Sequence, residues 1–146
     1  EALCELASLY SLRRMAEEWK TNAPYPNWKG YGKSLHGYAQ NYIDKVEKPA
    51  DMAVWYQTHA EHLSKNATDR AKNRVLAAKL LPMFERDPSL WQAVAYLNKG
   101  EDRKERDFKA HMKAWYEHAP RRFGPQIVEI ASMLGSSNPS SWFVHR

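Results

Sequence analysis

The sequence predicts an all-α fold, a compact bundle of about six to seven helices in a single domain. Apolar residues recur at three- and four-residue steps in successive segments, and capping or helix-breaking residues separate those segments. No pair of segments has the pattern of a strand hairpin, and no internal repeat is evident. The 146 residues are 43% hydrophobic and 27% charged, which is typical of a globular domain.

The first helix is expected over about residues 2–22, where one face is apolar. Its apolar residues are Leu3, Leu6, Leu9, Leu12, Ala16 and Trp19. Prolines and glycines then predict a connection, and a shorter helix is expected over residues 34–48 with Ser34 as its N-cap. Pro49 ends that helix.

Asp51 is expected to cap a third helix, which weakens around residues 64–66. Thr68 is expected to cap a fourth helix that Pro82 kinks. Asp87 and Pro88 predict the start of a fifth helix, which ends before Gly100.

A sixth helix is expected to start among Glu101 and Asp102 and to stop at Pro120. Pro125 opens a short seventh helix that ends at Gly135. The helical domain therefore spans residues 1–135. Residues 136–146 form a polar and then aromatic tail, which either frays or docks Trp142 and Phe143 onto a groove.

The sequence carries no apolar run of the roughly 20 residues that span a bilayer, and nothing at its start resembles a signal peptide. A cytoplasmic location without membrane contact is expected. The single cysteine, Cys4, excludes an intrachain disulfide, and its place in an apolar helix predicts a buried, inert thiol.

Positive charge is concentrated toward the middle of the chain. The net charge is +5, and residues 65–86 carry six basic residues against two acidic ones. A seven-residue spacing predicts a row on one side of a continuous helix, with Arg70 and Arg74 beside it. The row consists of Lys65, Lys72, Lys79 and Arg86. Arg121 and Arg122 offer a second anchor for phosphates. The alternative is a solvated face that serves only solubility.

Residues 25–38, YPNWKGYGKSLHGY, form a basic and aromatic stretch. They are not a P-loop, because the motif that ends in Gly-Lys-Ser would need glycine at Asn27. Trp28 and Tyr31 are expected to stack on bases in a loop whose Lys29 and Lys33 meet phosphates. Alternatively, the rings pack back onto neighbouring helices.

These features favour a non-enzymatic module that binds DNA or RNA mainly through phosphates, as a small subunit of a nucleoprotein complex. The alternative is a protein interaction module that docks an acidic or other partner surface through the aromatic loop or the tail. A third hypothesis is a metal or haem protein with ligands among His36, His59, His62, His111 and His118. Neither an enzyme motif nor a cofactor motif appears, so no cofactor is expected.

Overall fold

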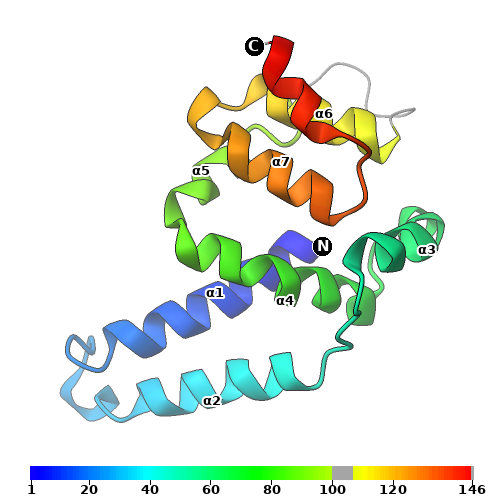
Figure 1. Ribbon diagram of the computed structural model, residues 1–146. Coiled ribbons are helices and arrows are strands. Elements are labelled where there is room, and N and C mark those ends of the chain that lie inside the picture. The colour runs from blue at the N-terminus through cyan, green and yellow to red at the C-terminus, as the bar shows by residue number, and fades with distance from the viewer. Residues whose placement is uncertain (100–106, 146) are drawn as a thin grey trace. The chain divides into compact units, whose positions relative to one another are not determined.

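The computed structural model describes residues 1–99 and 107–145, and it confirms the all-α prediction. These residues form seven α-helices and four 3-10 helices, with no strand in either described range (Figure 1). The chain divides into two compact units: unit 1 contains Glu1–Lys48 and Lys65–Glu85, and unit 2 contains Pro49–Ser64 and Arg86–Arg146. The predicted division into residues 1–135 and a tail stays a prediction.

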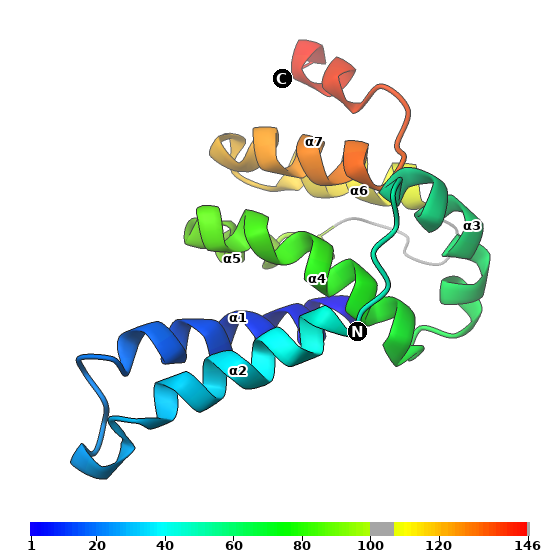
Figure 2. The ribbon, with the colours of Figure 1, turned by 60° about the horizontal axis from the view of Figure 1, so that its bottom comes forward.

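Unit 1 is built on an antiparallel pair of helices, α1 (Ala2–Glu18) and α2 (Tyr31–Asp44), which lie side by side in both views (Figures 1 and 2). A 3-10 helix, η1 (Pro26–Trp28), lies in the connection. Gly32 permits the close approach of the two helices, because a Cβ at this position would lie 2.7 Å from the backbone oxygen of Ala16.

The third helix of unit 1 is α4 (Arg70–Arg86), whose final residue belongs to unit 2. Two ion pairs join α4 to α1. Arg13 Nε lies 2.6 Å from Glu85 Oε1, and Arg70 Nε lies 3.5 Å from Glu5 Oε1. Pro82 lies inside α4 without ending it, since the helix continues to Arg86.

The predicted bounds of the first two helices differ from the observed ones. The α1 helix ends four residues early, where Asn22 returns to the last turn by donating its backbone N–H to Glu18 O at 2.9 Å. The α2 helix starts three residues early with Gly30 as its N-cap, so the prediction of Ser34 as cap is wrong. The sequence signal failed because Gly32, which resembles a loop residue, is needed for helix packing.

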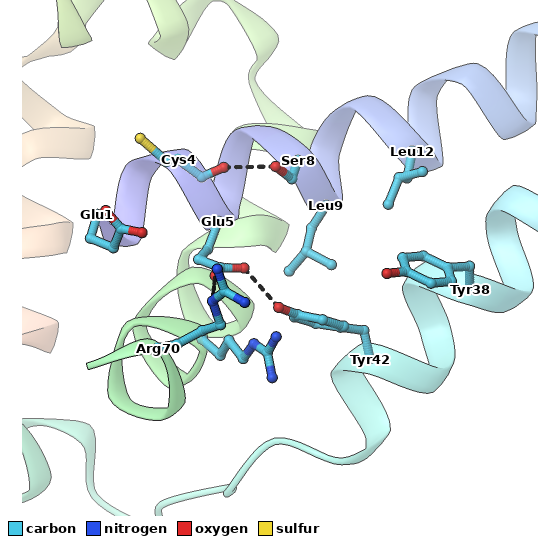
Figure 3. A pocket seen from close by; sticks show the side chains of 10 residues that line it. Glu1, Cys4, Glu5, Ser8, Leu9, Leu12, Tyr38, Tyr42 and Arg70 are labelled. Atoms are coloured by element: carbon cyan, nitrogen blue, oxygen red, sulfur yellow. Dashed lines mark hydrogen bonds and ion pairs between the residues drawn. The ribbon is translucent and has the colours of Figure 1, made fainter. Parts of the chain in front are cut away.

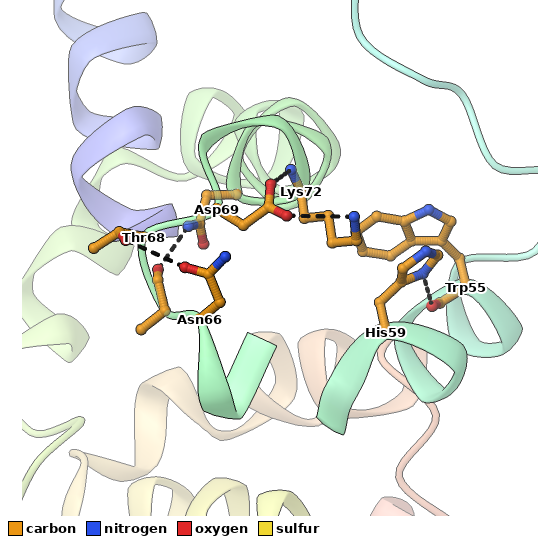
Figure 4. Close-up of polar contacts among 8 residues, drawn as sticks. Trp55, His59, Asn66, Thr68, Asp69 and Lys72 are labelled. Carbon is orange, nitrogen blue, oxygen red and sulfur yellow. Dashed lines mark hydrogen bonds and ion pairs between the residues drawn. The ribbon is translucent and has the colours of Figure 1, made fainter. Parts of the chain in front are cut away.

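The helix α3 (Met52–Lys65) has the cap that the sequence predicts, but α4 does not. Asp51 Oδ1 accepts hydrogen bonds from Ala53 N and Val54 N at 2.9 and 3.1 Å. At α4 the predicted cap Thr68 is wrong, because Asp69 Oδ1 accepts from Lys72 N at 3.0 Å (Figure 4). Thr68 instead donates its hydroxyl to Asn66 Oδ1 at 3.4 Å.

Unit 2 contains α3 up to Ser64 and the elements from residue 86 onward. These are η2 (Pro88–Leu90), α5 (Trp91–Val94), α6 (Phe108–His118), η3 (Arg121–Phe123), α7 (Gly124–Met133) and η4 (Pro139–His145). The fifth helix is therefore a 3-10 turn and four α-helical residues, much shorter than predicted.

Local end signals in unit 2 are confirmed where the structure describes them. Asp87 caps η2 through Ser89 N, and Pro125 lies in the first turn of α7. Gly135 follows α7 with φ of +84°, a conformation that favours glycine. Asp107 caps α6 by accepting from Ala110 N at 2.7 Å, while the predicted start at Glu101 and Asp102 lies outside the described residues.

Aromatic side chains organise the packing of unit 2. Buried Trp115 of α6 donates its Nε1–H to Ala93 O at 2.8 Å, and Tyr56 of α3 meets Phe108 with ring centroids 4.5 Å apart. The C-terminal η4 buries Trp142 to 7% exposure, 5.7 Å from the Tyr116 ring. Of the two predicted fates of the tail, docking of Trp142 onto its own unit is the one observed.

Candidate nucleic-acid interface

Three rings contact one another where α1 turns into α2, those of Trp19, Tyr25 and Trp28. Together with Tyr31, the first residue of α2, they are here called the aromatic tip. Trp28 lies at its centre, with its ring centroid 5.3 Å from Trp19 and 5.1 Å from Tyr25. Much of the tip faces solvent, because Tyr25, Trp28 and Tyr31 are 58%, 38% and 59% exposed. Trp19, Tyr25 and Trp28 thus support one another, while Tyr25, Trp28 and Tyr31 keep exposed ring surface available for a ligand.

Two of the lysines beside the aromatic tip, Lys29 and Lys33, have no acidic partner among the described residues. Lys29 and Lys33 are exposed, and neither side chain forms an ion pair or hydrogen bond with any residue that the structure describes. Lys20 differs, since its Nζ lies 2.6 Å from Glu17 Oε2. No acidic residue occurs between Glu18 and Asp44, so every charged side chain of residues 19–43 is basic.

The backbone of this stretch corrects one expectation. Residues 25–38 are not a continuous glycine-rich loop, because η1 occupies Pro26–Trp28 and α2 begins at Tyr31. Lys33 and Tyr38 therefore have helical backbone, which fixes the direction of each side chain. The predicted combination of rings and unpaired lysines is present, but on ordered helical turns.

The cationic row predicted for residues 65–86 is interrupted and largely paired. Lys65 is the last residue of α3, and residues 66–69 separate it from α4. On α4, Lys72 pairs with Asp69 at 3.4 Å and Arg70 with Glu5 at 3.5 Å. Arg86 pairs with Glu129 at 2.7 Å.

The remaining two cations of the predicted site on α4 have no carboxylate partner in the part of the chain that the structure describes. Lys79 is exposed to solvent, whereas Arg74 is half-buried with its guanidinium 4.0 Å from the centre of the Tyr42 ring. As nucleic-acid-binding residues, all six stay a prediction.

Arg121 and Arg122, the predicted second anchor, are exposed on η3 of unit 2. Arg122 donates from Nη2 to Gln92 Oε1 at 2.7 Å, and its guanidinium lies 4.6 Å from the Phe123 ring. These arginines belong to unit 2, whereas the aromatic tip belongs to unit 1.

Two of the histidines, His59 and His118, contact the backbone of their own helices. His59 Nδ1 lies 2.8 Å from Trp55 O, where Figure 4 shows the ring against that tryptophan, and His118 Nδ1 lies 2.8 Å from Ala114 O. Within residues 1–99 and 107–145, no group of three or more His, Cys, Asp or Glu residues could hold a metal ion. Nothing in this geometry favours the metal or haem hypothesis.

Cys4 differs from its prediction, and Tyr42 was not predicted as a site residue. Cys4 is exposed on α1, so the expectation of a buried thiol is wrong. Tyr42 was not among the predicted site residues, although it contacts Arg74 and donates its hydroxyl to Glu5 Oε2 at 2.9 Å. The available signal was spacing, because Tyr31, Tyr38 and Tyr42 lie at intervals of seven and four on one helical face.

Among the described residues, none of the helices combines the length and the apolar character needed to cross a membrane. A scan against models of known protein families, a search of curated proteins and a search of solved structures each found no match to this chain. Proposals about function therefore depend on the side chains and their geometry.

Proposed function

We propose that the protein is a non-enzymatic module that binds single-stranded nucleic acid through the aromatic tip. The observation that carries this proposal is the exposure of three rings beside two unpaired lysines, in a stretch free of acidic residues. Bases stack on such rings whatever their sequence, while cations track the phosphates. Lys29 and Lys33 are the phosphate contacts of this interface.

The tip suits stacking because its rings are held in place before a ligand arrives. Trp28 rests between Trp19 and Tyr25, so a bound base meets a platform that needs little ordering. Stacking of one base on an aromatic side chain contributes about 1–3 kcal/mol. Two phosphate contacts add a salt-dependent contribution with a slope of about −0.7 per phosphate for single strands.

The same rings also support the alternative, a protein interaction module, because aromatic residues are frequent anchors of protein interfaces. Trp28 and its neighbours are the anchors for that function. Trp142 is not a free anchor, since it is buried in unit 2. Salt dependence separates the two functions, because stacking with phosphate contacts weakens with salt and an apolar protein interface does not.

The test is fluorescence anisotropy with labelled single- and double-stranded DNA and RNA at about 50 and 200 mM salt, using nuclease-treated protein. Trp28→Ala should weaken single-strand binding by about 5- to 150-fold, because it removes a stacking platform. The matched control is Phe143→Ala, an exposed ring of unit 2 that is 47% exposed. The Phe143→Ala variant should bind single-stranded nucleic acid with the same affinity as the unmodified chain.

The lysines are tested by the double variant Lys29→Gln/Lys33→Gln, with Lys113→Gln as an exposed control from unit 2. The double variant should weaken binding and reduce the salt slope by about 1.4. Absence of single-strand binding at the lower salt concentration would refute the proposal and leave the protein interaction module. Unchanged affinity in Lys72→Glu/Lys79→Glu would remove the α4 cations from the interface.

A further inference from the structure

A cavity of about 380 Å³ opens among α1, α2 and α4 of unit 1 (Figure 3). Its size falls within the range of small-molecule sites. The side chains that matter for binding are Leu9, Leu12, Tyr38, Tyr42, Arg70 and Arg74. We call this cavity the Arg74 pocket; it combines an aliphatic floor, two rings and two guanidinium groups.

Arg74 is a half-buried cation that lies 4.0 Å from the centre of the Tyr42 ring but has no carboxylate partner among the described residues. Its Nε is buried and has no hydrogen-bond partner, and no carboxylate pairs with it in the described residues. Glu5, the nearby acid, is engaged elsewhere: its Oε1 lies 3.5 Å from Arg70 Nε, and its Oε2 accepts from the Tyr42 hydroxyl. Because buried charge is costly unless it is paired, Arg74 is suited to an anion from outside the chain.

Further cations lie on the second side of Arg74. Tyr42 and Arg74 also line another cavity of about 340 Å³, to which Lys45 and Lys72 contribute. Acidic residues are present too: Glu1 and Glu5 line the Arg74 pocket, and Glu47 lines the other cavity. Of the cations, Arg70 and Lys72 already face acids, whereas Arg74 and Lys45 form no ion pair within residues 1–99 and 107–145.

The mouth of the pocket offers a flat aromatic surface. Tyr38 is 62% exposed, lines the pocket and lies 6.4 Å from the Tyr42 ring, centroid to centroid. Figure 3 shows both rings projecting from α2, with Leu9 and Leu12 of α1 opposite them. Because Tyr38 and Arg74 line the same cavity, one ligand can contact the Tyr38 ring and the Arg74 guanidinium together.

We infer that the Arg74 pocket binds a small phosphorylated aromatic compound, such as a nucleoside monophosphate. The phosphate lies against the guanidinium of Arg74, and the aromatic ring stacks on Tyr38. This inference goes beyond the proposed function, because it uses neither the lysines nor the tryptophans of the aromatic tip. The nucleotide is either free or part of a strand, since Tyr31 and Tyr38 lie on one face of α2, about 10.5 Å apart along its axis.

The test is a titration of the full chain with AMP, adenosine and inorganic phosphate, followed by amide NMR shifts. AMP should bind most tightly, because it alone supplies both the ring and the anion. Arg74→Gln should weaken AMP binding at least about tenfold, the equivalent of one charge-assisted contact. Lys79→Gln, an exposed cation of the same helix outside the pocket, should change it less than about twofold.

Three outcomes overturn the inference: no AMP binding at millimolar concentration, equal AMP affinity in Arg74→Gln, or loss of AMP binding in Trp28→Ala. If circular dichroism shows that Arg74→Gln does not fold, Tyr38→Ala takes its place, because that side chain is largely exposed. It should weaken AMP and adenosine but not phosphate, and unchanged AMP affinity refutes the pocket. If a 5′-phosphorylated oligonucleotide competes with AMP, the natural ligand is part of a strand. If both bind at the same time, the natural ligand is a free nucleotide.

Discussion

Tyr42 links three helices through its hydroxyl and its ring. It donates to Glu5 of α1, while its ring lies under Arg74 of α4. Burial is the main cause that raises the pKa of Tyr42, the hydrogen bond to Glu5 and the charge of Glu5 raise it further, and Arg74 opposes them. The folded state therefore holds this proton to higher pH than the unfolded chain does.

The free energy of unfolding should consequently fall as the pH rises above about 10, the usual pKa of tyrosine. The sign follows from proton binding, because the folded state binds more protons in this range. Urea unfolding at several pH values measures how steeply the free energy of unfolding falls with pH. Tyr42→Phe should make this fall less steep. The part that remains comes from Tyr56, because burial also raises the pKa of that residue. Tyr38→Phe is the control, and a slope equally reduced in both variants would contradict the assignment to Tyr42.

At the level of helices, Gly32 and Gly37 of α2 allow two effects of glycine on stability to be compared: close helix packing and the low helix propensity of its backbone. Both lie in the same helix, but a Cβ at Gly32 would meet the Ala16 backbone oxygen at 2.7 Å, whereas nothing lies within 4 Å of one at Gly37. Gly32→Ala should destabilise the fold by about 1–3 kcal/mol, since backbone atoms must shift. Gly37→Ala should stabilise it by about 0.5–1 kcal/mol.

Thermal and urea unfolding of the two variants provide the comparison. Equal shifts of the same sign would show that α1 and α2 do not approach as closely as this contact requires. Circular dichroism at low temperature checks that both variants retain their helical content. The pair also tests why the start of α2 was misjudged from sequence, since the reason for Gly32 lies sixteen residues away at Ala16.

Helix ends were predictable where one residue carries the signal. Asp51, Asp87 and Gly135 act as the sequence indicates, because a cap depends on local side-chain and backbone geometry. Thr68 and Asp69 are adjacent residues of capping type, and only the register of α4 decides between them. The short α5 was overestimated, since apolar spacing continues beyond the last helical hydrogen bond.

For the whole molecule, the positive charge lies mainly in unit 1. Its residues include twelve basic and eight acidic side chains, so this unit carries +4 of the net charge of +5. A single-stranded oligonucleotide should therefore shift amide resonances of residues 19–42 most strongly, with small changes in unit 2. Dominant shifts around Arg121 and Arg122 would place the interface in unit 2 instead. Lys29→Gln/Lys33→Gln should suppress the shifts at the tip.

Composition alone singled out residues 25–38, but it could not assemble the Arg74 pocket. Trp28, Lys29, Tyr31 and Lys33 are close in sequence, so their proximity follows from a short turn. Glu5, Tyr42 and Arg74 come from three helices, and their contacts depend on how those helices pack. The periodicity of one sequence shows on which face of a helix each residue lies, but it does not show which helix faces contact each other.

The interleaving of the two units constrains how this chain can be divided. Because α4 returns to unit 1 after α3 has contributed to unit 2, each unit consists of two separate stretches of chain. No single breakpoint yields either unit whole; a cut after Lys48 would leave α1 and α2 without the arginines of α4. Neither unit can therefore be transferred to another protein as one cassette, and recombination would preserve the Arg74 pocket only by moving residues 1–85 together.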